Sequence, residues 1–178
     1  MPTGWSTNGS FVDQNEGSPP NGMAFSTWQI ATVDNDPCRW QTTGASVGPT
    51  VDDLVAALAA QKRGATVTPV AVMVDGFSGK QINLMVPLDV TIAAMAACDG
   101  GQYKTWTDPS GGDRYKRGPS GQHDLLDILD VNGRTFVIQG SFYPANTAAD
   151  LAGLQAIADP VKITPSSPVS TATAAPTP

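Results

Sequence analysis

The segment HDLLDILDVNGRTFVIQGSFYP, residues 123–144, constrains the fold of this chain more than any other. Two runs in which apolar and polar residues alternate lie on either side of Asn132-Gly133. Alternation with a period of two is typical of a strand with one buried face, and Asn-Gly is the strongest short signal for a tight hairpin turn. The segment therefore predicts a long β-hairpin, and with it an antiparallel sheet.

Further strands are predicted on the N-terminal side of this hairpin. Residues 5–13 and 23–33 are strand-like, and the turn-forming residues 15–22 between them predict a second hairpin. The alternation in residues 23–33 slips near Ser26 and Thr27, which we interpret as a β-bulge within one strand.

The middle of the chain predicts a mixture of strands and loops. Residues 66–87 indicate two strands joined near the DGFSGK turn, and residues 102–107 indicate one more. Residues 88–101 fit either a short helix or a turn. The glycine- and proline-rich residues 108–122 are expected to form a loop.

Two helices are predicted from apolar residues at helical spacing. The first covers residues 51–62, with Thr50 as the N-cap and Asp53 three residues later, as in a capping box. The second covers residues 148–158 and begins in the same way after Thr147.

Together these elements predict an α+β fold, an antiparallel sheet of about six or seven strands with two helices packed on one face. A parallel sheet is not expected, because the only passage from strand to helix to strand is the one around residues 51–62. We expect a single α+β domain over residues 1–163. Residues 164–178 are rich in Pro, Ser, Thr and Ala and predict a disordered tail or linker.

The net charge of the chain argues against nucleic acid as a partner, and its hydropathy indicates whether it contains a membrane span or a signal peptide. The net charge is −6, so non-specific binding to nucleic acid is not expected. No stretch has the roughly 18 apolar residues of a membrane span, and the first residues lack the basic start and apolar core of a signal peptide. We therefore expect either a cytosolic protein or one whose signal or membrane tether lies outside this sequence.

The two cysteines, Cys38 and Cys98, allow three interpretations. A structural zinc site needs four ligands and a catalytic one usually three, whereas the chain adds only one histidine to the two thiols. A thiol nucleophile needs a histidine base and an orienting group, and nothing in the sequence supports one. A disulfide uses both cysteines and fits an even count in an exported domain.

Three residues are the candidate contacts to a ligand or partner. His123 is the only histidine, and no motif around it indicates a catalytic residue, a metal or a cofactor. Trp28 and Trp106 lie in alternating segments and are expected in the core. Trp5 and Trp40 lie near loops, so Trp5, Trp40 and His123 are the residues expected to face a ligand.

The acidic residues are interpreted as structural. Asp124, Asp127 and Asp130 fall on both faces of one strand and are expected to be solvated rather than to form an acid/base pair. The run DNDP at residues 34–37 is interpreted as a turn, because the further oxygen ligands of an EF-hand calcium loop do not follow it.

Several motifs give the chain a family resemblance over about residues 4–163. The paired cysteines, the PTVDDLVAALAAQ helix, the DGFSGK turn and the closing ADLAGLQAI helix resemble a group of actinobacterial extracytoplasmic domains found in secreted or membrane-anchored proteins. The resemblance implies a disulfide between Cys38 and Cys98 and a location beyond the membrane. More distantly, the last hairpin with its following helix is similar to the Mog1/PsbP-like sandwich, and mycobacterial lipoproteins of the LpqN type are similar in this respect.

From these observations we expect a non-enzymatic, extracytoplasmic binding or sensing domain for a small ligand or a protein partner. Two alternatives remain open. The first is a secreted hydrolase with an unrecognised site around His123 and nearby aspartates. The second is a structural adaptor that works through protein contacts alone.

Overall fold

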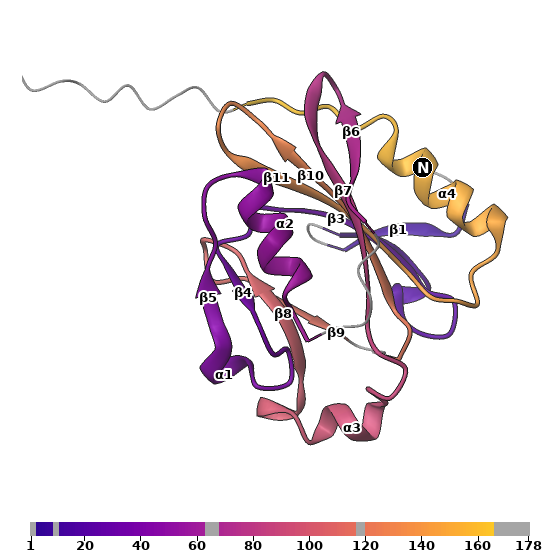
Figure 1. Cartoon of the computed structure of the whole chain (residues 1–178). Coiled ribbons are helices and arrows are strands. Elements are labelled where there is room, and N and C mark those ends of the chain that lie inside the picture. The colour runs from indigo at the N-terminus through magenta and orange to yellow at the C-terminus, as the bar shows by residue number, and fades with distance from the viewer. Residues whose placement is uncertain (1–2, 9–10, 63–67, 117–119, 166–178) are drawn as a thin grey trace, which may run out of the picture.

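The strands form two antiparallel sheets in a computed structural model that describes residues 3–8, 11–62, 68–116 and 120–165 (Figure 1). The large sheet has the order β1 (Trp5–Asn8), β2 (Phe11–Gln14), β3 (Met23–Trp28), β11 (Thr135–Phe142), β10 (His123–Asp130), β7 (Phe77–Met85) and β6 (Val70–Val74). The small sheet has the order β5 (Gly44–Ser46), β4 (Thr32–Asp34), β8 (Tyr103–Thr107) and β9 (Asp113–Lys116). The helices are α1 (Trp40–Thr43), α2 (Val51–Ala59), α3 (Ile92–Ala96) and α4 (Ala148–Ala158). The α+β class and the large sheet of about seven strands are thus confirmed, and the small sheet is additional.

The predicted hairpin forms the centre of the large sheet. Strand β10 pairs with β11 from His123 opposite Phe142 to Asp130 opposite Thr135. Asn132 and Gly133 have φ values of 56° and 80°, which is the left-handed conformation that Asn-Gly turns favour. The hairpin is joined by β3 on one side and by β7 on the other.

Local capping signals set the starts of the two longer helices. Thr50 and Asp53 form a reciprocal capping box at α2, and Thr147 and Asp150 form one at α4. Helix α2 ends at Ala59, so Lys62 lies beyond its last turn rather than in it.

Helices α2 and α4 lie on opposite faces of the large sheet, and the prediction of two helices on one face is wrong. Helix α2 and the small sheet cover one face, where Leu54 and Leu58 pack with Leu126 and Trp106. Helix α4 covers the other face, where Leu154 packs with apolar residues of β3 and β11. Neighbouring residues of a strand point to opposite faces. The hairpin therefore contributes side chains both to the apolar cluster under α2 and to the one under α4.

The single strand predicted over residues 23–33 is two strands in different sheets. Strand β3 ends at Trp28, and the chain crosses to the small sheet as β4. The slip at Ser26 is not a bulge, since β3 pairs with β11 without a break in register. Instead, Met23 and Phe25 face α4, whereas Ser26 and Trp28 face the small sheet.

Three other predictions require correction or lie outside the described chain. The first strand is divided into β1 and β2, which pair with each other, and β2 forms the expected hairpin with β3. The predicted loop over 108–122 contains β9, because residues 113–116 pair with β8. Of the predicted tail, residues 166–178 lie outside the described residues.

Candidate functional site

Cys38 and Cys98 form a disulfide, which excludes the zinc and nucleophile interpretations because each sulfur is bonded to the other. Their Cα atoms are 4.5 Å apart, and the bridge spans 60 residues of sequence. It lies in a small apolar cluster with Val86 and Tyr103. The disulfide is consistent with an extracellular location, since such bonds persist in oxidising compartments.

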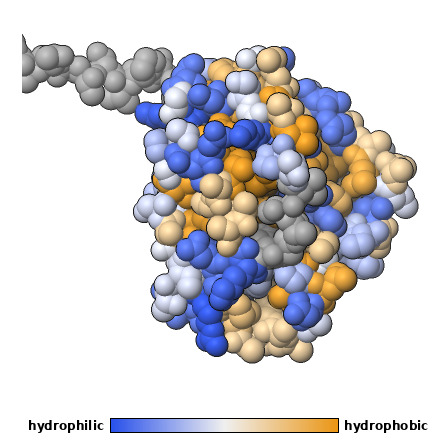
Figure 2. All heavy atoms as spheres, viewed as in Figure 1, coloured by the Kyte–Doolittle hydropathy of each residue, from blue (hydrophilic) through white to orange (hydrophobic). Residues whose placement is uncertain are grey.

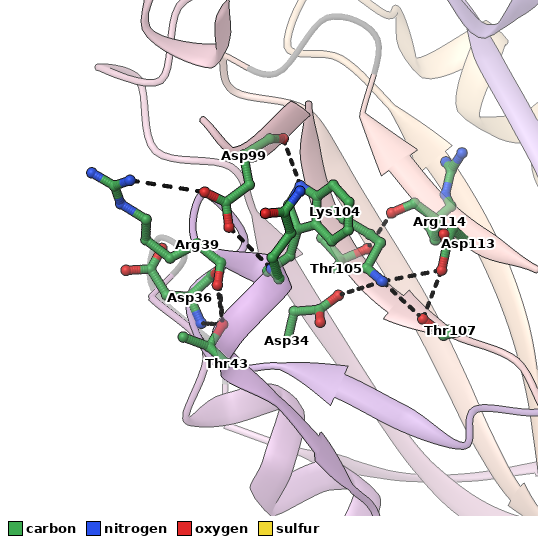
Figure 3. A network of polar contacts seen from close by, with 12 residues as sticks. Asp34, Asp36, Arg39, Thr43, Asp99, Lys104, Thr105, Thr107, Asp113 and Arg114 are labelled. Atoms are coloured by element: carbon green, nitrogen blue, oxygen red, sulfur yellow. Dashed lines mark hydrogen bonds and ion pairs between the residues drawn. The ribbon is translucent and has the colours of Figure 1, made fainter. Parts of the chain in front are cut away.

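Trp40 stabilises the loops beside this disulfide. Its indole N–H donates to the backbone oxygen of Asp99 over 2.8 Å, and the Lys104 ammonium lies 4.7 Å from its ring centroid. The Asp99 carboxylate lies 3.8 Å from the Arg39 guanidinium (Figure 3). The described contacts of Trp40 therefore join two segments of the chain, and its ring is half-buried.

Lys104 joins three strands of the small sheet through a buried cluster of charges. Its ammonium lies 3.1 Å from the Asp113 carboxylate and 3.8 Å from that of Asp34, and it donates to the Thr107 hydroxyl (Figure 3). Lys104 is 8% exposed and Asp34 is 1% exposed. Burial raises the pKa of Asp34 to about 6, against the opposing effect of Lys104. The segment predicted as a turn thus begins with a buried carboxylate.

We expect the Asp34→Asn variant to gain stability relative to the wild type as the pH rises from 4.5 to 7.5. A carboxyl whose pKa is higher in the folded than in the unfolded state binds its proton more tightly in the folded protein. Protonated Asp34 therefore stabilises the fold near pH 4, and this stabilisation is lost above about pH 6, where the carboxyl ionises. The shift corresponds to about 3 kcal/mol of folding free energy. Urea unfolding of both proteins at several pH values measures it, and a difference that stays constant with pH would contradict the assignment.

Trp5 and His123 lie on the face of the large sheet that α4 covers, away from Trp40. Trp5 is half-buried and packs with the apolar cluster under α4. Figure 1 shows β1, which contains Trp5, and α1, which contains Trp40, on different sides of the molecule. The three predicted contact residues therefore do not form one site.

The His123 ring stacks on Phe142 at one end of the central hairpin. The ring centroids are 4.9 Å apart and the planes differ by 2°. The Nδ1 atom of His123 lies 3.1 Å from the side-chain oxygen of Asn83. Asp124 follows His123 on the strand and faces the small sheet instead, where Ser141 and Gln139 donate to its carboxylate.

These contacts bear on the hydrolase alternative. Ser141 lies beside Asp124, with a 2.9 Å hydrogen bond between the side chains, but both residues are buried between the sheets, on the opposite side from His123. Residues 44–48 read G-x-S-x-G, a spacing that the sequence interpretation overlooked. Ser46 ends an exposed edge strand, and α2 begins only at Val51, so this segment lacks the sharp turn of a nucleophile elbow.

A groove between α4 and the large sheet has the composition of a small-molecule site. Its volume is about 190 Å³. Its walls are mainly apolar side chains from β3, β10, β11 and α4, namely Phe25, Leu125, Ile138, Phe142, Leu151, Leu154 and Ala158. Its polar side chains are Gln81, Asp127 and Gln155. Phe142 joins this groove to the predicted contact residue His123.

Asp127 is the charged residue of the groove, and the prediction that it is solvated is wrong. Its side chain is half-buried, and Gln81 on the neighbouring strand donates to its carboxylate over 2.8 Å. Burial raises the pKa of the Asp127 carboxyl above its usual range, while the hydrogen bond from Gln81 lowers it. Asp124 is fully buried as well, so of the three aspartates only Asp130 is exposed as predicted.

Two larger hollows are lined by carboxylates that already have partners within the protein. One, of about 470 Å³, lies between the start of α2 and the β10–β11 turn, where Lys80 pairs with Asp52 and Asp130 accepts from the backbone of Gly133. The other, of about 350 Å³, lies beside Trp28, where the Asp108 carboxylate accepts hydrogen bonds from its own turn.

Apolar residues also reach the surface at α3. Leu88 is 68% exposed and Ile92 is 66% exposed. Figure 2 shows a hydrophobic area at the bottom of the view, where Figure 1 places α3, and hydrophilic residues among hydrophobic ones elsewhere on this side. No helix of the described residues is long and apolar enough to cross a membrane.

No family model matches the chain, and no curated protein or solved structure matches it. Function is therefore inferred from the geometry of the groove and from the disulfide.

Proposed function

We propose that this chain is a non-enzymatic, extracytoplasmic binding or sensing domain that holds a small ligand in the groove between α4 and the large sheet. The observation that carries the proposal is the composition of the groove. Aliphatic and aromatic side chains form its walls, and a carboxylate with two amides supplies a few polar contacts. This combination is typical of small-molecule sites, in which apolar surface gives affinity and a few polar groups fix orientation.

The size of the groove favours a small ligand over a large one. Its volume of about 190 Å³ is below the roughly 300–1,000 Å³ of pockets for drug-sized molecules. It therefore suits a small molecule, or one projecting group of a larger one. The alternative of a protein-interaction adaptor has less support, because among the described residues nothing beside the exposed Leu88 and Ile92 indicates a particular partner.

The positions of the ionisable side chains support binding rather than catalysis. A general acid/base mechanism needs groups that converge on one reacting atom. His123 and Asp124 face opposite sides of the sheet, and Asp124 with Ser141 lies between the two sheets. Asp127 lies on the same side as His123, but its described partner is the Gln81 amide rather than an imidazole.

The disulfide supports a location outside the cytoplasm. Reducing compartments keep protein thiols free, whereas the Cys38–Cys98 bridge needs an oxidising environment to form and persist.

We expect the Ala158→Phe variant to lose most of its affinity for small fragments that bind wild-type protein. Ala158 is half-buried and lines the groove, so the larger ring fills space that a ligand needs. Fragments of up to about ten non-hydrogen atoms are titrated by ¹H–¹⁵N NMR. For wild-type protein we expect shifts at the backbone amides of Leu125, Ile138, Gly140 and Phe142.

The matched control is Ala156→Phe, which makes the same substitution at an exposed position of the same helix. Leu151→Trp is a second blocking variant, chosen because Leu151 lies at the partly exposed rim of the groove. Fragment binding that survives both Ala158→Phe and Leu151→Trp, or shifts centred on Trp40 or Ile92, would refute the proposed site.

A further inference from the structure

Asp127 lines the groove, and no cationic side chain in the described part of the chain pairs with it. The other side chains that line it are neutral. Among the described residues Asp127 forms no ion pair, and its carboxylate accepts a hydrogen bond from the Gln81 amide. Lys80 is adjacent to Gln81 on β7, but it points to the other face of the sheet, where its ammonium pairs with Asp52 over 2.6 Å.

The Asp127 carboxylate has capacity for further hydrogen bonds. An ionised carboxylate offers about four lone-pair sites on its two oxygens, and Gln81 occupies one of them. Charges withdrawn from water are normally paired in folded proteins, because an unpaired one loses hydration without compensation. The partial burial of Asp127 therefore favours a cation in the groove.

The surroundings of Asp127 suit a cation attached to an apolar body. Leu125 and Ile138 flank it on β10 and β11, and they can contact hydrocarbon. The Phe142 ring also lines the groove, and the negative face of an aromatic ring attracts ammonium groups. The net charge of −6 raises the local concentration of small cations and lowers that of anions.

We propose that the groove selects small amphipathic amines. The Asp127 carboxylate is the counter-ion of the ligand's ammonium group, and the apolar walls contact the hydrocarbon part of the ligand. This inference rests on the proposed function and specifies the ligand class of the same site. Gln81 acts as a positioning residue, since its amide holds the carboxylate by a 2.8 Å hydrogen bond.

The test compares three probes of nearly the same shape, benzylammonium, benzyl alcohol and benzoate, by NMR titration at pH 7.5 and 150 mM salt. We expect benzylammonium to bind about tenfold more tightly than benzyl alcohol, because a hydrogen bond between charged groups contributes more than a neutral one. Benzoate should bind more weakly than either. In Asp127→Asn, whose side chain has almost the same shape, the preference for benzylammonium should disappear while benzyl alcohol still binds.

Asp130→Asn is the matched control, because it removes one negative charge from an exposed position of the same strand. It should leave the preference unchanged. If Asp127→Asn and Asp130→Asn reduced the preference for benzylammonium over benzyl alcohol equally, the inference would be overturned, because the preference would then come from the overall charge of the protein. Equal binding of benzyl alcohol and benzylammonium in the groove of wild-type protein would overturn the inference and leave the proposed function intact. Absence of binding by all three probes up to about 20 mM would count against both.

Discussion

Replacing Cys38 and Cys98 together by serine is expected to lower the free energy of unfolding by about 4 kcal/mol. The bridge closes a loop that spans 60 residues, and in the chain-entropy model the stabilisation from such a cross-link grows with the logarithm of the loop length. The loss should be seen as a lower urea midpoint, with tryptophan fluorescence as the probe.

The control for this prediction is chemical reduction. Wild-type protein treated with a phosphine reductant should unfold at the urea concentration of the serine variant, and the serine variant itself should not respond to the reductant. The hydrogen bond from Trp40 to Asp99 joins the same two segments, so the reduced protein should still fold. A wild-type stability that is the same with and without reductant would refute the structural role of the bridge.

Trp106→Ala is expected to lower the free energy of unfolding by about 3–5 kcal/mol, the range for truncating a buried large aromatic residue. Trp106 is fully buried on β8 and packs with α2 and the large sheet, so it holds the two sheets together. Its ring is 5.9 Å from that of Trp28 at an angle of 83°, an edge-to-face contact. Urea unfolding followed by far-UV circular dichroism measures the loss.

Met73→Ala provides the comparison for this variant. Met73 is 72% exposed on β6, the edge strand of the large sheet, so its truncation should change the stability by less than about 0.5 kcal/mol. If Trp106→Ala cost no more than Met73→Ala, Trp106 would not be the contact that joins the two sheets.

The elements that could be predicted from the sequence depend on local chemistry. The Asn132-Gly133 turn was recognisable because few residue pairs accept two consecutive left-handed conformations. The helix starts at Thr50 and Thr147 were recognisable because a capping box needs only residues three positions apart. The hairpin and both helices therefore agree with the structure within a few residues.

The layers of the fold depend on contacts that no local pattern contains. Strand β9 lies in a segment rich in glycine and proline, and it is a strand because it pairs with β8. The chain changes sheet after Trp28 because β4 pairs with β8, where Trp106 lies opposite Val33 although it is far away in the sequence. Alternation in one segment shows that a strand has two faces, but it does not show what covers each face.

The groove could be predicted from the sequence only in part. His123 was a candidate because it is the only histidine, and it lies next to Phe142 in the wall of the groove. Asp127 and Gln81 were missed as a pair, because they are 46 residues apart and meet only when β10 pairs with β7. The sequence contains one signal for this site, which is that Asp127 lies on the same face of the hairpin as the apolar residue Leu125. The sequence interpretation expects Asp127 to be solvated.

The position of a bound ligand decides whether the groove between α4 and the large sheet is the binding site. Intermolecular nuclear Overhauser effects between benzylammonium and ¹³C-labelled wild-type protein would locate the ring and the methylene group. We expect contacts from the ring to the side chains of Leu125, Ile138 and Leu151, with the methylene protons next to Asp127 and Gln81. Contacts to Trp40, or to Leu88 and Ile92, with none to the residues under α4, would contradict the claim that the groove is the binding site.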